Sequence, residues 1–192
     1  GKHLPLWLEL FSVSRRGYKS QRMLVQQAIT YLVDRLGKLG LWLFDRGFDN
    51  WEFFAFLEGL ELKFLIRVNS NRIVKLADGR SLALGRLAQE SCVQAEFVWG
   101  RRRQGRGYVI EVAWAEFMIP QNGQKLWLIV ARGFGRHPLL LVTNRPVATE
   151  LSAVHLVKAY LKRWGVEEAG RLVKQAFDLE NLRVLSWAGL VK

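Results

Sequence analysis

The hydrophobic pattern of the first third of the chain alternates between two periods. From Ser20 onward, apolar residues recur at helical spacing as far as Gly37, a residue type that commonly ends helices. Alternating or continuous apolar runs over residues 5–13, 41–44 and 62–68 predict strands, the second of them buried. Strands and helices thus follow one another, an order that is typical of a parallel or mixed α/β sheet.

The segment that follows the second strand predicts a loop and a short helix. The strand ends at Asp45, and residues 46–48 are predicted to form a loop. Asp49 with Glu52 three residues later matches a capping box, which predicts a helix of about two turns that stops near Gly59. A carboxylate therefore stands at the point where a strand turns into a loop.

The middle of the chain consists of short β-like runs, which are separated by turn-forming residues. These runs cover residues 73–76, 95–99, 108–114 and 125–131. Asp-Gly, Asn-Gly and glycine-rich turns between them favour antiparallel hairpins over further α/β units. A buried strand over 139–143 and a helix over about 149–177 follow. We therefore predict an α/β core over 1–68 and 139–192 that is interrupted by a β-rich insertion over 69–138.

The composition indicates a polyanionic partner. The 192 residues include 29 Lys and Arg against 17 Asp and Glu, a formal net charge of +12. A hydrophobic content of 50% excludes intrinsic disorder, and the single cysteine, Cys92, excludes an internal disulfide and a cysteine-rich zinc site. No apolar run reaches the roughly 18 residues of a membrane span. We expect a soluble, cytoplasmic protein that binds nucleic acid.

Positive charge is concentrated in and just after the predicted insertion. Between residues 101 and 145 the chain carries eight basic and two acidic residues. Arg101, Arg102 and Arg103 lie near a glycine-rich turn, so they are expected at a hairpin tip. A solvated tip and a contact with phosphates explain this cluster equally well, and the pattern leaves both open.

Four side chains that could take part in chemistry share one stripe of the predicted C-terminal helix. Tyr160, Arg163, Glu167 and Lys174 fall within an arc of about 60° when each residue turns the helix by about 100°. A polar solvent face with Arg163 and Glu167 paired explains any one pair, but it explains the accompanying aromatic residues less well. Asp45 is the second candidate, because open α/β sheets bind ligands at the carboxyl ends of their strands. Capping of the loop is an equally good explanation of this aspartate.

Two blocks of sequence carry a resemblance to a known family. One is Asp45-Arg46-Gly47-Phe48-Asp49, and the other is Tyr160-x2-Arg163-x3-Glu167-x6-Lys174. The first resembles the block around the second catalytic aspartate of DDE transposases from bacterial cut-and-paste insertion sequences. The second matches the Tyr-Arg-Glu-Lys signature of that group, and the likeness extends over essentially the whole chain. It implies a ribonuclease-H-like mixed sheet with flanking helices and a β-rich insertion.

The resemblance also implies a chemistry and its partners. Asp45 and Glu167 would be catalytic residues and metal ligands for two Mg²⁺ or Mn²⁺ ions, which suit an attack on a phosphodiester. Arg163 and Lys174, supported by Tyr160, would hold backbone phosphates. Double-stranded DNA, as transposon ends and as target, is the implied partner of a homodimer in the bacterial cytoplasm at the nucleoid.

Some members of the family stack a flipped base on an aromatic residue of the insertion. Trp99, Trp114 and Trp127 are the candidates here. No motif singles out one of them, and a place in the core of the insertion is the favoured interpretation of each.

The chain departs from the family pattern at the first catalytic aspartate. Residues 3–13 resemble the strand that follows this acid, no Asp precedes Asp34, and Glu9 matches no catalytic motif. We therefore expect a fragment or a decayed copy that does not cut DNA unaided. The competing hypothesis is a basic DNA-binding module that keeps the scaffold without the chemistry. A ribonuclease-H-like nuclease outside transposition is a third.

Overall fold

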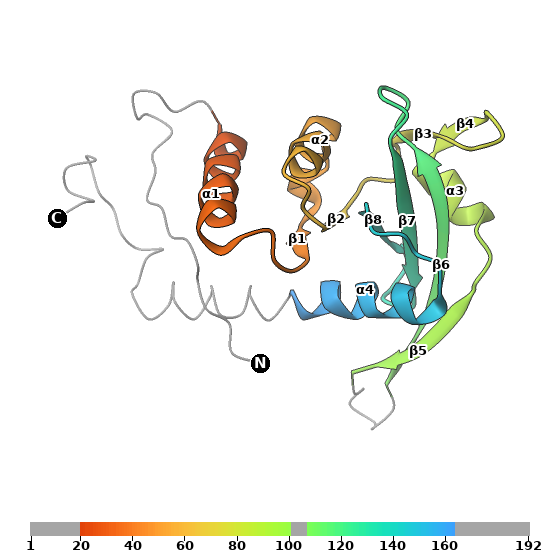
Figure 1. Cartoon of the computed structure of the whole chain (residues 1–192). Coiled ribbons are helices and arrows are strands. Elements are labelled where there is room, and N and C mark those ends of the chain that lie inside the picture. The colour runs from red at the N-terminus through yellow and green to blue at the C-terminus, as the bar shows by residue number, and fades with distance from the viewer. Residues whose placement is uncertain (1–19, 101–106, 164–192) are drawn as a thin grey trace, which may run out of the picture. The chain divides into compact units, whose positions relative to one another are not determined.

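The computed structural model describes residues 20–100 and 107–163 (Figure 1). The chain divides into two compact units, of which one is residues 40–161 and the other comprises 1–39 and 162–192. Each is described by itself below. The strand predicted over 5–13, and the part of the C-terminal helix predicted beyond residue 163, lie outside the described residues.

Helix α1 (Gln21–Leu36) belongs to the unit that contains the N-terminus. Its N-cap is Ser20, whose Oγ accepts a hydrogen bond from the N–H of Met23 at 3.2 Å. Gly37 ends it with a φ of +76°, and its N–H donates to the carbonyl of Val33 at 2.8 Å. The helix predicted from Ser20 to Gly37 is confirmed.

Residues 40–161 form one mixed sheet, in which the described residues supply eight strands. The strands are β1 (Trp42–Phe44), β2 (Phe64–Arg67), β3 (Ile73–Lys75), β4 (Ser81–Ala83), β5 (Ala95–Trp99), β6 (Tyr108–Met118), β7 (Lys125–Arg132) and β8 (Leu139–Thr143). Their order is β1-β2-β8-β7-β6-β3-β4, and β5 also pairs with β6. The pair β1 and β2 is parallel, and the other pairs are antiparallel. The fold is the predicted α/β fold of the ribonuclease-H-like type.

Helices cover both faces of this sheet. Helix α4 (Glu150–Lys162) packs through Val157 against a cluster that includes Leu65 of β2, and Figure 1 shows it lying across the strands. On helix α2 (Trp51–Gly59), Phe54 lies 5.4 Å, ring centre to ring centre, from Phe64. Since Phe64 and Leu65 are consecutive strand residues, they point to opposite faces. The sheet is therefore sandwiched between α2 and α4, and its central strand β8 is buried at every position.

The boundaries of several elements follow the predictions, and others depart from them. Strands β5 and β8 have the predicted bounds, while β6 runs four residues further than the predicted 108–114. Strand β4 and helix α3 (Leu84–Glu90) were not predicted. The strand predicted as fully buried over 41–44 is only partly so, because Phe44 is buried whereas Trp42 and Leu43 are half-buried.

Two predictions about the segment after β1 are wrong. Residues 46–48 do not form an irregular loop but a 3-10 turn, η1 (Arg46–Phe48), because the Asp45 side chain caps it. Asp49 does not cap α2. Asn50 does so, and its Oδ1 accepts from the N–H of Phe53 at 3.1 Å. This leaves the Asp49 side chain available for the buried contacts described below.

Candidate active site at the strand ends

Four neighbouring strands each have one terminus at the same end of the sheet. Strands β1 and β2 are parallel, so their carboxyl ends coincide. Strand β8 runs antiparallel to β2, with Arg67 opposite Leu141, so the amino end of β8 lies beside the carboxyl end of β2. Strand β7 runs antiparallel to β8 in turn, with Ala131 opposite Leu139. The pairing therefore brings together residues that are far apart in the sequence.

Asp45 is the carboxylate at this end of the sheet. It is exposed, follows the last residue of β1, and its Oδ1 accepts the N–H of Gly47 at 2.8 Å. Within residues 20–100 and 107–163, its Oδ2 makes no hydrogen bond or ion pair. The two interpretations of Asp45 are therefore compatible, because one oxygen caps η1 and the other remains available to a ligand.

Gly47 leaves the room that this carboxylate occupies. A Cβ at position 47 would lie 3.1 Å from Asp45 Oδ1, which is closer than ordinary van der Waals contact. The same residue therefore donates the hydrogen bond that orients Asp45 and lacks the side chain that would displace it.

The predicted metal site can be compared with the side chains present. A carboxylate oxygen is the donor that Mg²⁺ prefers, and Asp45 Oδ2 offers one. Among the described residues, no three His, Cys, Asp or Glu side chains cluster closely enough to hold a metal ion. Glu167, the other predicted ligand, lies outside the described residues. Asp45 thus fits the role of a single metal ligand, and the remainder of the predicted set is untested.

Asp49, four residues further on, has a different environment. Its side chain is 1% exposed, and Oδ1 accepts from Arg72 Nε at 2.8 Å. Its Oδ2 accepts from both the backbone N–H and the side-chain amide of Asn69, each at 2.8 Å. Arg72 Nη2 also donates to the Asp49 carbonyl, and its guanidinium lies 4.7 Å from the ring centre of Trp51. With both oxygens engaged, Asp49 links the η1 segment to the chain beyond β2.

A basic cavity of about 790 Å³ opens at the same strand ends. Its lining includes Arg46, Arg67, Arg132, Arg136 and His137, and none of the described residues that line it is acidic. Arg132 is engaged, because its Nη2 donates to the carbonyls of Ala88 at 2.6 Å and Ser91 at 3.2 Å, at the end of α3. Sequence reasoning missed this cavity, although each of these arginines lies at or near the end of a predicted strand.

Of the remaining predicted site residues, two lie within the described part of the chain. Tyr160 is 3% exposed and lies in the core cluster under α4, so the alternative of a polar solvent face is wrong for this residue. Arg163 is half-buried. Glu167, Lys174, Arg101, Arg102 and Arg103 lie outside the described residues, and their roles remain predictions.

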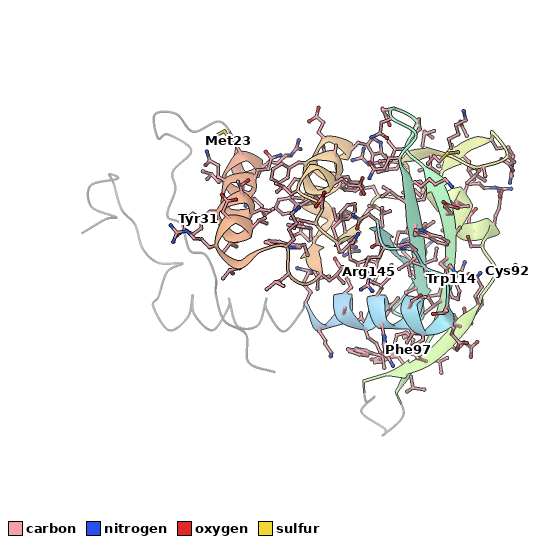
Figure 2. The ribbon with its side chains drawn as sticks, in the orientation of Figure 1. Met23, Tyr31, Cys92, Phe97, Trp114 and Arg145 are labelled. Atoms are coloured by element: carbon pink, nitrogen blue, oxygen red, sulfur yellow. The ribbon has the colours of Figure 1, made fainter. Side chains whose placement is uncertain are left out.

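The three candidate tryptophans are half-buried. Trp99, Trp114 and Trp127 all pack against the cluster that α4 covers. Figure 2 shows Trp114 and Phe97 on the strands beside this helix, and Lys158 of α4 lies 4.9 Å from the Phe97 ring centre. These contacts agree with the interpretation of the tryptophans as packing residues.

Comparisons with known proteins identify the family. No helix in the described part of the chain is long and apolar enough to cross a membrane. A search of curated proteins finds no match. The sequence does match the transposase DDE domain over residues 3–192, a stretch that includes Asp45 and every described strand. Since this match covers almost the whole chain, the protein belongs to the transposase DDE domain family.

Proposed function

We propose that the chain is the catalytic region of a cut-and-paste insertion-sequence transposase, which cleaves transposon DNA ends and joins them to target DNA. Membership of the family supports a transposase function and implies a DNA substrate. The observation that carries the finer proposal is the exposed Asp45 carboxylate at the end of β1 beside a basic cavity, and one oxygen of this carboxylate has no partner among the described residues.

Asp45 and Glu167 are the residues proposed to hold the divalent cations. When bound, two such ions would stabilise charge on the attacking and leaving oxygens of a phosphodiester. The Gly47 N–H fixes the orientation of the Asp45 carboxylate before metal or DNA arrives. In this proposal Arg163 and Lys174 hold phosphates, since guanidinium and ammonium groups are the phosphate-binding side chains.

The test is metal-dependent cleavage and joining of a labelled duplex that carries the transposon end. The assay uses the full-length protein. We expect Asp45→Asn and Glu167→Gln each to lower cleavage at least about 100-fold, as befits loss of several kcal/mol of transition-state stabilisation. Asp34→Asn, an exposed aspartate on α1, is the matched control and is expected to retain activity.

Metal rescue separates a ligand from a structural residue. Asp45→Cys offers a softer thiolate donor, which binds Mn²⁺ better than it binds Mg²⁺. We expect this variant to recover cleavage in Mn²⁺ and not in Mg²⁺. Wild-type cleavage by Asp45→Asn in Mg²⁺ would contradict the proposed role.

A second candidate function is a basic DNA-binding module without chemistry. The net charge of +12 and the arginine-lined cavity favour it for the chain on its own. DNA affinity of the full-length protein without cleavage at any metal concentration would favour this module over the transposase. Cleavage without joining of ends would instead favour a nuclease outside transposition.

A further inference from the structure

The cavity at the strand ends has an unusual charge balance. Each of the four strand ends contributes one arginine: Arg46 follows β1, Arg67 ends β2, Arg132 ends β7 and Arg136 precedes β8. The side chains of Arg46, Arg67 and Arg136 make no ion pair or hydrogen bond within residues 20–100 and 107–163. Three guanidinium groups that have no partner in the described part of the chain therefore share one opening.

Several cations elsewhere in the same unit are paired, whereas the side chains of Lys63, Lys75 and Arg145 have no ion pair within residues 20–100 and 107–163. Arg80 lies 2.7 Å from Asp78, Arg86 lies 2.8 Å from Glu90, and Lys125 lies 3.3 Å from Glu116. Acidic partners are thus present on this surface, and none of the described residues that line the cavity is acidic. Like charges that share a cavity repel one another and concentrate anions there. This arrangement favours an external polyanion as the missing partner.

The fourth arginine holds the wall of the cavity. Arg132 donates to carbonyls at the carboxyl end of α3, the negative end of the helix dipole. It thereby anchors the helix that supplies Gly85, Ala88 and Gln89 to the lining. Arg132 is a positioning residue, which leaves Arg46, Arg67 and Arg136 as the exposed binding groups.

We infer that this cavity binds the phosphodiester backbone of a DNA strand that continues from Asp45, and that Arg46, Arg67 and Arg136 hold its phosphates. Guanidinium groups match phosphate in geometry and charge. The volume of about 790 Å³ exceeds what a single phosphate needs and admits a short stretch of backbone. Ser70 and Gln89 add neutral donors for phosphate and sugar oxygens. Because Arg46 is the residue after Asp45, a strand held by Arg46 would lie close to the proposed reaction site.

This inference rests on the proposed function for its DNA substrate, and its test is independent of cleavage. Binding of a fluorescein-labelled DNA duplex of mixed sequence is measured by anisotropy in EDTA, over a series of salt concentrations. The triple variant Arg46→Gln, Arg67→Gln, Arg136→Gln is expected to lower the salt slope by about 3, near 0.9 per lost phosphate contact. Its affinity at 0.1 M salt is expected to fall by about two orders of magnitude or more.

A charge-matched triple variant is the control. This variant, with Arg80→Gln, Arg86→Gln and Lys125→Gln, also removes three positive charges, but from paired, exposed positions outside the cavity. We expect its salt slope to change by less than about 1. Equal losses in the two triple variants would assign DNA binding to the diffuse field of the protein and overturn the inference. All six positions are exposed, so circular dichroism is expected to show folded protein for both variants.

Two further outcomes are decisive. Unchanged DNA affinity in the cavity variant, together with loss of inorganic phosphate or ATP binding, would assign the cavity to a small anion and overturn the inference. If the cavity variant loses DNA affinity in EDTA and the full-length wild type does not cleave in Mg²⁺ or Mn²⁺, the catalytic proposal fails while the cavity assignment stands.

Discussion

Two charged regions that begin four residues apart in the sequence differ in whether their charged side chains are paired and buried. At the strand ends, Asp45, Arg46, Arg67 and Arg136 leave carboxylate and guanidinium groups open to solvent. In the second region, which we call the buried pair, Asp49 and Arg72 are joined by a direct hydrogen bond, and the Asp49 side chain is buried. Both regions are held by the same short segment around η1.

Burial is what separates the two aspartates. The Asp49 carboxylate is 1% exposed and accepts three hydrogen bonds, whereas Asp45 is exposed and accepts one. A buried charge without partners is costly, so Asp49 must be paired for the fold to be stable. An exposed carboxylate needs no partner, because water solvates it. Pairing at Asp49 is therefore explained by stability, while the open oxygen of Asp45 is free to serve function.

Replacing the buried aspartate is expected to have the largest effect on stability. Asp49→Asn leaves Arg72 without its counter-ion, and Asn69 keeps only a neutral acceptor. We expect the free energy of unfolding to fall by about 3 kcal/mol, at the lower end for a broken buried pair. Arg72 is 25% exposed, so water relieves part of the cost. Urea denaturation followed by circular dichroism measures the change.

Asp45→Asn is the control for this comparison, since it changes the same side chain at an exposed site. Its free energy of unfolding is expected to lie within about 0.5 kcal/mol of wild type. A double-mutant cycle of Asp49→Asn with Arg72→Gln is expected to give a coupling energy above about 1 kcal/mol. Equal stability losses at positions 45 and 49 would remove the distinction between the two regions.

Periodicity and cap residues were sufficient to predict the bounds of α1 and of β8. Ser20 and Gly37 bracket α1, and the apolar run of β8 gives its bounds because every residue of the strand is buried. Strand β4 has three residues, too few to show a period, and α3 begins after Ala83, which has no capping side chain. Both elements depend on tertiary contacts that no local pattern displays.

The candidate site could be predicted only as far as local position allows. Asp45 was found because a carboxylate at a strand end has a meaning within one short segment. Asp49 and Asn50 are adjacent and both suit an N-cap, so the choice between them depends on Arg72, which lies 23 residues away. Prediction of the cavity would have required the antiparallel pairing of β2 with β8, which brings Arg67 and Arg136 together. Strand register is not visible in a single sequence.

Gly47→Ala probes the exposed region with a smaller change. The new Cβ would lie 3.1 Å from Asp45 Oδ1, so the carboxylate must shift by a few tenths of an ångström. Since a misplacement of about 1 Å can cost about 100-fold in rate, we expect cleavage to fall about 3- to 10-fold, with a higher Mg²⁺ requirement. Stability is expected to change by less than about 1 kcal/mol.

Gly59→Ala is the matched control for this substitution. Position 59 ends α2, and a Cβ there would meet no atom within 4 Å. We expect this variant to keep the wild-type dependence of cleavage on Mg²⁺. A wild-type Mg²⁺ dependence for Gly47→Ala as well would show that Asp45 tolerates displacement, which would weaken its assignment as a metal ligand.

The prediction with the smallest expected effect on stability tests whether pairing or burial makes an aspartate structurally important. Asp78 is paired as Asp49 is, because its Oδ1 accepts the Arg80 N–H at 3.0 Å and its Oδ2 accepts Arg80 Nε at 2.7 Å, but its side chain is 52% exposed. The backbone N–H of Arg80, and then its guanidinium, hold the pKa of the Asp78 carboxyl below the ordinary value of 3.8. A carboxyl with a lowered pKa in the folded state stabilises the fold above its unfolded pKa, and this contribution disappears as the pH falls through the folded pKa.

The midpoint temperature of Asp78→Asn is therefore expected to lie slightly below that of the wild type above about pH 4, and to converge with it at lower pH. Thermal unfolding of the variant and of the wild type between pH 2 and 7 measures this difference. A loss at Asp78 as large as that at Asp49 would mean that hydrogen bonding alone, rather than burial, makes an aspartate structural. The contrast between Asp45 and Asp49 would then have to be explained by the number of their donors.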